Sequence, residues 1–523
     1  MSFRFPIDGF NSLAKRKPII IVTLLLFCGF FFFYGIAAGD FYRTEGLRGI
    51  LAAEILRNGN WIVPTLYGEP FFTKPPGMYV AIALASRPFG TVMEWTARLP
   101  AALAATATAF LFYFYFRRQI DPRAGLIAAL LLPLSFMWLD KATAAEIDMV
   151  EVAWVTLALI CFLRALEIAE AEGSTFEDQK NRGACHVRRG ASNDAPRPRL
   201  RASRLWFWWL AALLSVAGGL LTKWTAPAFF YGTVIPLLWW RGRLRLLFQR
   251  HHRVAAGAAA GICLAWAGWA IALGGWQPFL TMVSREGLMH ISPSHHHRPY
   301  PWLETLVHPF RILGASLPIS VFALPALSPG FARLWDERGR RLLQTLQCWT
   351  WPNLLVWSLV PEHAPRQSFP LFPGLAGLAA MVWVAWLTNR LPWRLPKVTP
   401  GKVLVGLLIC WLGVKLAYVH AVVPERMHKR APRNKAEQIR NLVPEGAVLY
   451  VFRLKDEGIM FYYGRPVRRL QQFKQLPSNG EPAYCILDEP EWKQSDCPME
   501  VLLRLQDEQG APIVLARTSP ATR

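Results

Sequence analysis

The chain has 523 residues, of which 53% are hydrophobic, and it carries 23 tryptophans and 32 phenylalanines. Its mean hydropathy is +0.22, and the apolar content exceeds that of a typical soluble domain, which argues against a soluble enzyme. The formal net charge is +23, but the lysines and arginines stand in short loops between apolar runs. That distribution is typical of a membrane protein whose basic loops set its orientation, and it argues against a nucleic-acid partner.

Apolar runs long enough to cross about 30 Å of hydrocarbon recur along the chain. The first follows the basic cluster Lys15–Lys17 and shows no clear cleavage site, so we expect a retained helix rather than a signal peptide. In all, the pattern predicts about eleven transmembrane helices. They are residues 19–38, 97–116, 124–139, 147–168, 205–222, 226–240, 254–273, 310–327, 349–361, 369–387 and 403–421.

Loops rich in lysine and arginine alternate with loops poor in them, and this alternation predicts the orientation of the chain. Residues 1–18 and the loop 169–204 are placed in the cytoplasm, and the polar, basic composition of the loop predicts disorder. Three regions then face away from the cytoplasm. They are the loops 39–96 and 274–308 and the residues from 423 onward.

Two segments of the first outer loop are predicted to be helices at the membrane surface. Met78–Ser86 is apolar but too short to span, so we expect a re-entrant or interfacial helix. Ile50, Leu51, Glu54 and Ile55 recur at helical spacing, which predicts an amphipathic helix lying in the interface.

The C-terminal region has a soluble composition. Alternating apolar residues in Ala447–Phe452, a turn at Gly464–Pro466 and a short apolar run at Ala483–Leu487 predict a small α/β domain. We therefore expect an all-α polytopic membrane domain over residues 19–422, followed by a soluble α/β domain over residues 423–523.

This α/β region contains two cysteines, Cys485 and Cys497. They can form a disulfide if the region lies outside the cytoplasm. The sequence leaves the pairing open.

Carboxylates occur at two places on the predicted outer side. Glu45 begins the first-loop helix, and Glu146 and Asp148 begin the fourth span. Acids at a membrane edge are costly and are functional candidates. Two plain alternatives stay open, because Glu45 could compensate a helix dipole and the later acids could form a structural pair with Lys141.

Cations also gather on the predicted outer side. They are Lys74, Lys223, His296, His297, Arg298 and Arg366. Lys74 precedes two prolines that stiffen the backbone, and a rigidly placed ammonium suits a phosphate group; the alternative is a lysine that snorkels to lipid headgroups.

The histidine run leaves several alternatives open. His296 could ligate a divalent metal together with a carboxylate. The histidines and Arg298 could instead donate hydrogen bonds to phosphate, or belong to a solvated loop.

Acids and fixed cations beside the bilayer fit a lipid-phosphate substrate whose head group reacts at the outer surface. A carboxylate could act as general base on an acceptor hydroxyl or amine. The cations would stabilise the departing phosphate. Displacement at the anomeric carbon of a sugar would pass through an oxocarbenium-like state.

The stretch Glu45–Gly77 contains Gly-Asn-Trp-Ile-Val-Pro, Tyr-Gly-Glu-Pro and Lys-Pro-Pro. It resembles the GT-C class of integral membrane glycosyltransferases, in particular the protein O-mannosyltransferases and the lipid A aminoarabinose transferase. The resemblance covers most of residues 17–390. Later landmarks agree in order: Arg98-Leu-Pro100, Asp148, Leu221-Thr-Lys223, His296–Pro299, Arg366, Pro370 and Pro373.

This resemblance implies a polyprenyl-phosphate sugar donor and a lipid, protein or glycan acceptor on the outer face of a bacterial inner membrane. It implies that the first-loop acid, Glu45, activates the acceptor, and that Lys74 binds the donor phosphate.

The chain departs from the family pattern at two positions. Related enzymes usually carry Asp-Glu where this chain has Thr44-Glu45, so Glu45, Asp40 or Asp148 has to supply the base, or the protein is inactive. Thr73 replaces a residue that is often acidic in the lipid A enzyme, which weakens the case for a metal.

Two other classes of function are compatible with a polytopic chain. A transporter or flippase of a lipid-linked envelope precursor would need polar residues along the middle of several spans, and the predicted spans are nearly uncharged there. A scaffold that presents the C-terminal domain would need no reactive cluster.

Overall fold

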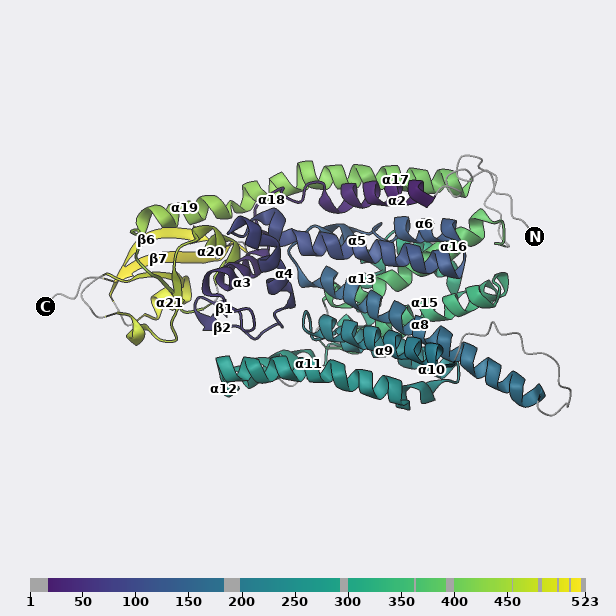
Figure 1. The fold of residues 1–523 in the computed structure, drawn as a ribbon. Helices are drawn as coiled ribbons and strands as arrows, with labels where there is room; N and C mark the ends of the chain where they lie inside the picture. Colours follow the sequence, from purple (N-terminus) through teal and green to yellow (C-terminus); the bar gives the residue numbers. More distant parts are fainter. Residues whose placement is uncertain are drawn as a thin grey trace.

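The computed structural model describes residues 17–182, 198–291, 300–361, 364–391, 399–453, 455–477, 482–495, 498–507 and 509–518. It is 71% helical. Figure 1 shows long helices side by side in a bundle, with a small sheet at one end. The mostly helical fold expected from the composition is confirmed.

Five helices in the described parts of the chain are long and apolar enough to cross a membrane. They are α5 (Glu94–Gln119), residues Ile147–Ala171 of α8 (Ile147–Arg182), α11 (Arg250–Gly274), the continuous pair η7 (Pro365–Leu371) and α16 (Phe372–Leu387), and the run Pro400–Leu442, which comprises α17 (Pro400–Ala417), η8 (Tyr418–Val422), α18 (Val423–Arg430) and α19 (Pro432–Leu442).

Further helices complete the bundle. They are α2 (Lys17–Cys28), η1 (Gly29–Phe33), α6 (Pro122–Leu131), α7 (Phe136–Ala142), α9 (Pro198–Leu220), α10 (Ala226–Trp240), η3 (Leu244–Phe248), α12 (Trp276–Ile291), α13 (Trp302–Ala315), α14 (Ile319–Ala323), η5 (Leu324–Leu327), η6 (Phe331–Leu334) and α15 (Glu337–Leu359).

Two of the predicted spans are interrupted. The run 124–139 breaks between α6 and α7 at Pro133, and the run 310–327 breaks between α13 and α14 at Pro318. Proline lacks a backbone donor and clashes with the preceding turn, so apolar character alone did not predict where the helices begin and end.

The helices α5 and α10 end at the end of the bundle that lies away from the sheet (Figure 1). The helices α11 and α17 begin at that same end.

The first loop forms the helices α3 (Glu45–Asn58) and α4 (Gly77–Ser86), with a two-stranded hairpin of β1 (Thr65–Leu66) and β2 (Glu69–Pro70) between them. Both helices were predicted. The apolar face of α3, however, is buried by protein, because Leu51 and Ile55 belong to one core with residues of α4 and of the C-terminal region. The expectation that this face lies in the lipid interface is wrong.

The C-terminal region contains a five-stranded mixed sheet of order β4-β3-β5-β7-β6. The strands are β3 (Leu449–Val451), β4 (Val467–Arg469), β5 (Tyr484–Asp488), β6 (Met499–Gln506) and β7 (Pro512–Thr518), and the helical segments are α20 (Glu457–Tyr463), η9 (Phe473–Gln475) and α21 (Glu489–Lys493). β3 runs parallel to β4 and β5, whereas β7 is antiparallel to β5 and β6.

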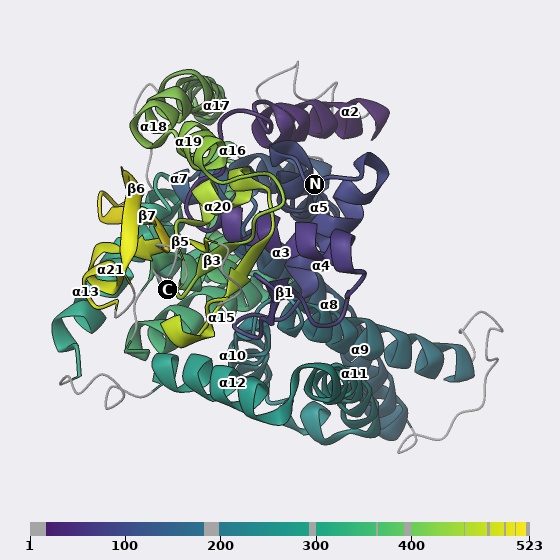
Figure 2. The same cartoon turned by 90° about the vertical axis from the view of Figure 1, so that its left-hand side faces the viewer.

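The sheet and the first loop share one hydrophobic core. Figure 2, seen from the sheet end, shows α3 and α4 beside α20 and β3. The Tyr462 hydroxyl donates to Glu94 at 2.8 Å and accepts from the Phe41 amide at 2.9 Å. The bundle and the sheet are therefore packed as neighbours, joined by the helical run Pro400–Leu442.

Candidate functional site

Glu45 is buried at the start of α3, with 3% of its surface exposed. Arg98 of α5 donates to it from Nε at 2.9 Å and from Nη2 at 3.0 Å. The backbone amides of Ala145 and Tyr42 donate to its two oxygens at 2.7 Å and 2.9 Å. Both carboxylate oxygens are thus engaged, which is the geometry of a structural ion pair.

Arg98 also fixes the chain that precedes α3. Its Nη1 donates to the carbonyls of Ile36 and Ala38 at 3.0 Å and 2.8 Å, and its Nη2 reaches the carbonyls of Gly39 and Asp40, both at 3.2 Å. A single guanidinium therefore satisfies the turn that links η1 to the first loop. Arg98, part of the motif Arg98-Leu-Pro100 noted in the sequence, therefore has a structural role: it holds this turn in place.

A second group of charges surrounds Lys223, in the turn between α9 and α10. Its ammonium donates to Asp148 Oδ1 and Glu151 Oε2, both at 2.8 Å. All three residues are buried, and the Thr225 hydroxyl donates to Glu151. The carboxyl groups of two residues thus share one ammonium.

Glu151 was missed in the sequence, although a signal was present. It follows Asp148 by three residues on α8, so the two side chains lie on one helix face.

The Lys74 segment packs on the same turn. The Gly77 amide donates to the Leu221 carbonyl at 2.8 Å, and Trp224 Nε1 donates to the Thr73 carbonyl at 3.3 Å. Lys74 itself forms an ion pair with Glu286 of α12. The Lys-Pro-Pro and Leu-Thr-Lys motifs, far apart in the sequence, are therefore in contact.

Glu146 stands between these two groups of charges. Lys141 donates to it at 2.7 Å, which is the pairing considered from the sequence. Burial raises the pKa of Glu146; the positive charge of Lys141 opposes that rise, and the nearby Asp148 adds to it. Burial lowers the pKa of Lys141, but Glu146 and Asp140 outweigh burial and the pKa is raised.

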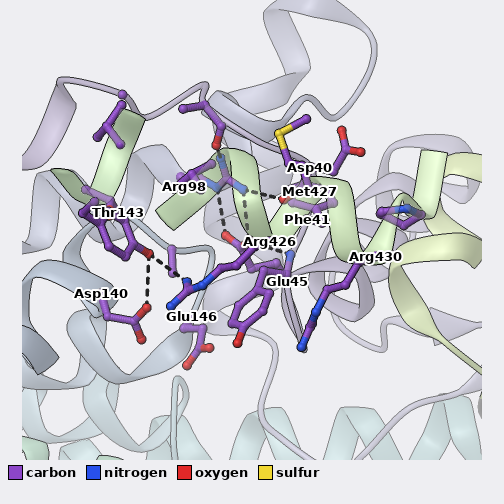
Figure 3. Close-up of a pocket in the computed structure, with 18 of the residues that line it drawn as sticks. Asp40, Phe41, Glu45, Arg98, Asp140, Thr143, Glu146, Arg426, Met427 and Arg430 are labelled. Atoms are coloured by element: carbon purple, nitrogen blue, oxygen red, sulfur yellow. Dashed lines mark hydrogen bonds and ion pairs between the residues drawn. The ribbon is translucent and has the colours of Figure 1, made fainter. Parts of the chain in front are cut away.

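A small cavity opens beside Glu45 and Glu146, with a volume of about 50 Å³. Figure 3 shows the labelled side chain of Arg426, from α18, reaching toward Glu146 and Asp140, with Arg430 of the same helix farther from them. Lys74, Asp148 and Lys223 are not among its lining residues. The charged groups therefore form this cavity and an adjoining buried cluster around Lys223.

The remaining predicted residues lie at the cavity, apart from it, or outside the described residues. Asp40 lines the cavity and pairs with Arg433 of α19 at 3.2 Å. Arg366 is exposed at the start of η7. His296, His297, Arg298 and Cys497 lie outside the described residues, so the metal ligand and the disulfide stay predictions. In the described segments, no group of three or more His, Cys, Asp or Glu could hold a metal ion.

Lys415 is a lining residue that the sequence reading passed over. It lies in α17 and is 1% exposed. The signal was a lone lysine inside an apolar run, a placement that is costly and marks functional candidates.

A family model described as dolichyl-phosphate-mannose-protein mannosyltransferase matches residues 73–174. The chain is 25% identical over 394 residues to an undecaprenyl phosphate-alpha-4-amino-4-deoxy-L-arabinose arabinosyl transferase of Pseudomonas savastanoi pv. phaseolicola, covering 73% of this chain and 63% of that protein. A protein of the same name from Edwardsiella ictaluri is 30% identical over 124 residues, which are 24% of this chain and 22% of that protein. The chain thus spans less than two thirds of the length of these relatives.

Two solved structures share the fold. ArnT from Cupriavidus metallidurans, bound to undecaprenyl phosphate, superposes with a TM-score of 0.67 at 16% identity, covering 96% of this chain and 97% of that one. The apo oligosaccharyltransferase of Archaeoglobus fulgidus gives 0.52 at 14% identity, covering 90% and 69%. The chain therefore has the fold of ArnT, and the resemblance to GT-C glycosyltransferases, first indicated by residues 45–77, is confirmed.

Proposed function

We propose that this protein transfers a sugar from a polyprenyl-phosphate donor to a lipid, protein or glycan acceptor. The observation that carries the proposal is the contact between the Lys-Pro-Pro loop and the turn of Lys223, next to the buried carboxylates of α8. That contact places fixed cations and acids together at the sheet end of an ArnT-like bundle. Cations stabilise the departing phosphate, and a carboxylate activates the acceptor.

Sidedness follows from charge. The end away from the sheet joins the helices through loops such as Arg241–Arg253, which is rich in arginine and suits the cytoplasmic side. We therefore place the cavity, the charged cluster and residues 423–523 on the non-cytoplasmic face of a bacterial inner membrane. The broken runs at Pro133 and Pro318 would each still cross as one bent span, which keeps the number of spans at about eleven.

Lys74 is our candidate for the donor phosphate. The exposed fractions of the two side chains are 25% for Lys74 and 16% for Glu286, so solvent reaches this ion pair. An incoming phosphate can replace the Glu286 carboxylate as the partner of the ammonium. Lys223 is less accessible, and we assign it the positioning of Asp148.

The proton-accepting carboxylate is assigned to the neighbours Glu146 and Asp148. Glu146 lines the cavity, and its raised pKa suits a group that must accept a proton and release it again. Glu45 is assigned a positioning role, since Arg98 engages both of its oxygens. Asp40 is held by Arg433 at the edge of the site.

Purified protein incubated with labelled donors tests the proposal. The first donor is undecaprenyl phosphate-4-amino-4-deoxy-L-arabinose, named after the relatives' activity, and the second is a polyprenyl-phosphate mannose. The assay follows the release of free polyprenyl phosphate with an envelope lipid extract as acceptor. We expect release by the wild type and its loss in Lys74→Ala.

The exposed residue Lys474 provides the matched control, Lys474→Ala, which should behave as the wild type. Translocation of the donor across proteoliposomes without release would instead support the flippase. Neither release nor translocation would support the scaffold.

A further inference from the structure

Lys415 is a buried cation inside the last long apolar helix. No carboxylate oxygen of the described residues lies within 4.0 Å of its ammonium, and the described residues give it no hydrogen-bond partner. A buried ammonium without a counter-charge is costly. The residue is therefore expected to serve a ligand rather than the stability of the fold.

Lys415 lines the cavity described above together with Tyr42, Tyr418 and Arg426. A cavity needs roughly 10–15 Å³ to hold one water. The volume of about 50 Å³ therefore offers space for a few water-sized atoms, which is the size of a phosphate group and not of a whole sugar.

Arg426 adds a second cation to this cavity. Its guanidinium carbon lies 4.5 Å from the ring centre of Tyr42 and 5.4 Å from that of Tyr418, and Nη1 donates to the Tyr418 hydroxyl at 3.3 Å. Among the described residues, no carboxylate oxygen lies within 4.0 Å of its nitrogens. The two rings hold the guanidinium in place and leave its charge available.

Three of the acids that line the cavity have a cation beside them. Glu45 is paired with Arg98, and Lys141 lies 2.7 Å from Glu146 and 3.3 Å from Asp140. The lining residues include four carboxylates and four basic side chains, so Lys141 beside them leaves a formal surplus of one positive charge, which favours an anion.

The surface beside the cavity is apolar. Leu412 and Leu416 of α17 are 43% and 36% exposed, and Met427 of α18 is 38% exposed. Both Figure 1 and Figure 2 show α17 along one edge of the bundle. Apolar side chains beside a positive cavity suit a lipid, with its chains on the helix and its phosphate inside.

We propose that Lys415 and Arg426 form a binding site for the phosphate group of a membrane lipid, separate from the Lys74 and Lys223 cluster. The site places the lipid headgroup beside Glu146, which lines the same cavity. Sugar transfer is not needed for this binding, so the site can be tested even if the proposed enzymatic function fails.

The test is equilibrium binding to the full-length protein in detergent, measured by native mass spectrometry. Phosphatidic acid is compared with a diacylglycerol of the same chains, which lacks the phosphate. We expect the wild type to prefer phosphatidic acid, and Lys415→Met to bind it about ten- to a hundredfold more weakly, since a charge-assisted contact is lost. Lys415→Arg should keep the preference.

Lys402→Met is the matched control, because Lys402 is exposed near the start of the same helix, and it should bind as the wild type. If Lys415→Met does not fold, Arg426→Gln takes its place with the same expectation. Equal binding of the two lipids, or unchanged binding in the folded variant, overturns the proposal.

Inorganic phosphate identifies the source of the anion. If it competes with phosphatidic acid in the wild type, with lower affinity in Lys415→Met, the site recognises the phosphate alone. If it does not compete, the site requires the lipid form. Both results support an anion site.

Discussion

Arg98 and Glu45 are joined by two hydrogen bonds, of 2.9 Å and 3.0 Å, across 53 positions of sequence. The same guanidinium holds the carbonyls of the preceding turn. The pair is therefore the clamp that fixes the first loop onto α5, close to the start of the cavity.

Breaking this clamp tests whether Glu45 positions the loop or accepts a proton. Arg98→Gln leaves a buried carboxylate unpaired, and we expect a loss of about 3–5 kcal/mol in the free energy of unfolding. The double variant Glu45→Gln/Arg98→Gln buries no charge and should lose less. Reversible denaturation in detergent measures both.

The activity of the double variant separates the two roles. A positioning Glu45 predicts that transfer is partly recovered relative to Arg98→Gln alone. A proton-accepting Glu45 predicts that the double variant stays inactive although it is more stable. Glu69, exposed on β2, supplies the control variant Glu69→Gln.

Asp148 and Glu151 form a natural matched pair, because each lies 2.8 Å from the Lys223 ammonium. Asp148→Asn and Glu151→Gln each leave a one-to-one ion pair, so we expect similar, modest losses of stability. Lys223→Met leaves two buried carboxylates and should cost more, about 3–5 kcal/mol or above. If kcat falls equally in both acid variants, Asp148 has no special role in transfer.

The pH dependence of transfer should report on Glu146. A proton acceptor must be ionised, so the rate falls as the pH falls through its pKa. Burial raises the pKa of Glu146 above the ordinary 4.5, and the acid limb of kcat should lie above that value. Lys141→Met removes a positive charge, raises the pKa further and should move the limb to higher pH.

Lys474→Met serves as the control for this measurement, because Lys474 is exposed in η9. Its acid limb should coincide with that of the wild type. An unchanged limb in Lys141→Met would remove Glu146 from the mechanism.

Gly77 allows the Lys74 loop to approach the turn of Lys223. A Cβ at this position would lie 2.7 Å from the Leu221 carbonyl oxygen, so Gly77→Ala must push the two segments apart. We expect a loss of about 1–3 kcal/mol and a higher KM for the donor. Donor titration measures the KM, and thermal unfolding the stability.

Gly406 offers the comparison, because no atom lies within 4 Å of an added Cβ there. Gly406→Ala, inside α17, should be neutral or stabilising by up to about 1 kcal/mol. A donor KM that is the same in Gly77→Ala and Gly406→Ala would show that the contact does not position Lys74.

Local patterns in the sequence predicted local structure well. Helical spacing gave α3, a short apolar run gave α4, and alternation with turn residues indicated the strands β3 and β5. The adjacency of Lys141 and Glu146 was also visible, because the two are only five positions apart.

Contacts between distant segments were less accessible. The sequence identified Arg98 as part of a motif but did not identify its ion-pair partner, because no local pattern connects Arg98 to Glu45. The sequence shows that Lys415 lies in an apolar run, but it does not reveal the cavity, because residues of α18 and of the first loop line that cavity together. The helix breaks at Pro133 and Pro318 were not predicted, because the mean hydropathy of an apolar run changes little when it contains one proline.

The helical run Pro400–Leu442 contains 43 residues, and Ala431, with a φ of +40°, interrupts it between α18 and α19. The run is longer than the roughly 20 residues that cross a membrane, and its last helix, α19, belongs to the same core as the strands β3, β5 and β7. Before this break, α18 holds Arg426 and Arg430 over the ring of Tyr42. The segment that links the bundle to the sheet is therefore also a wall of the cavity.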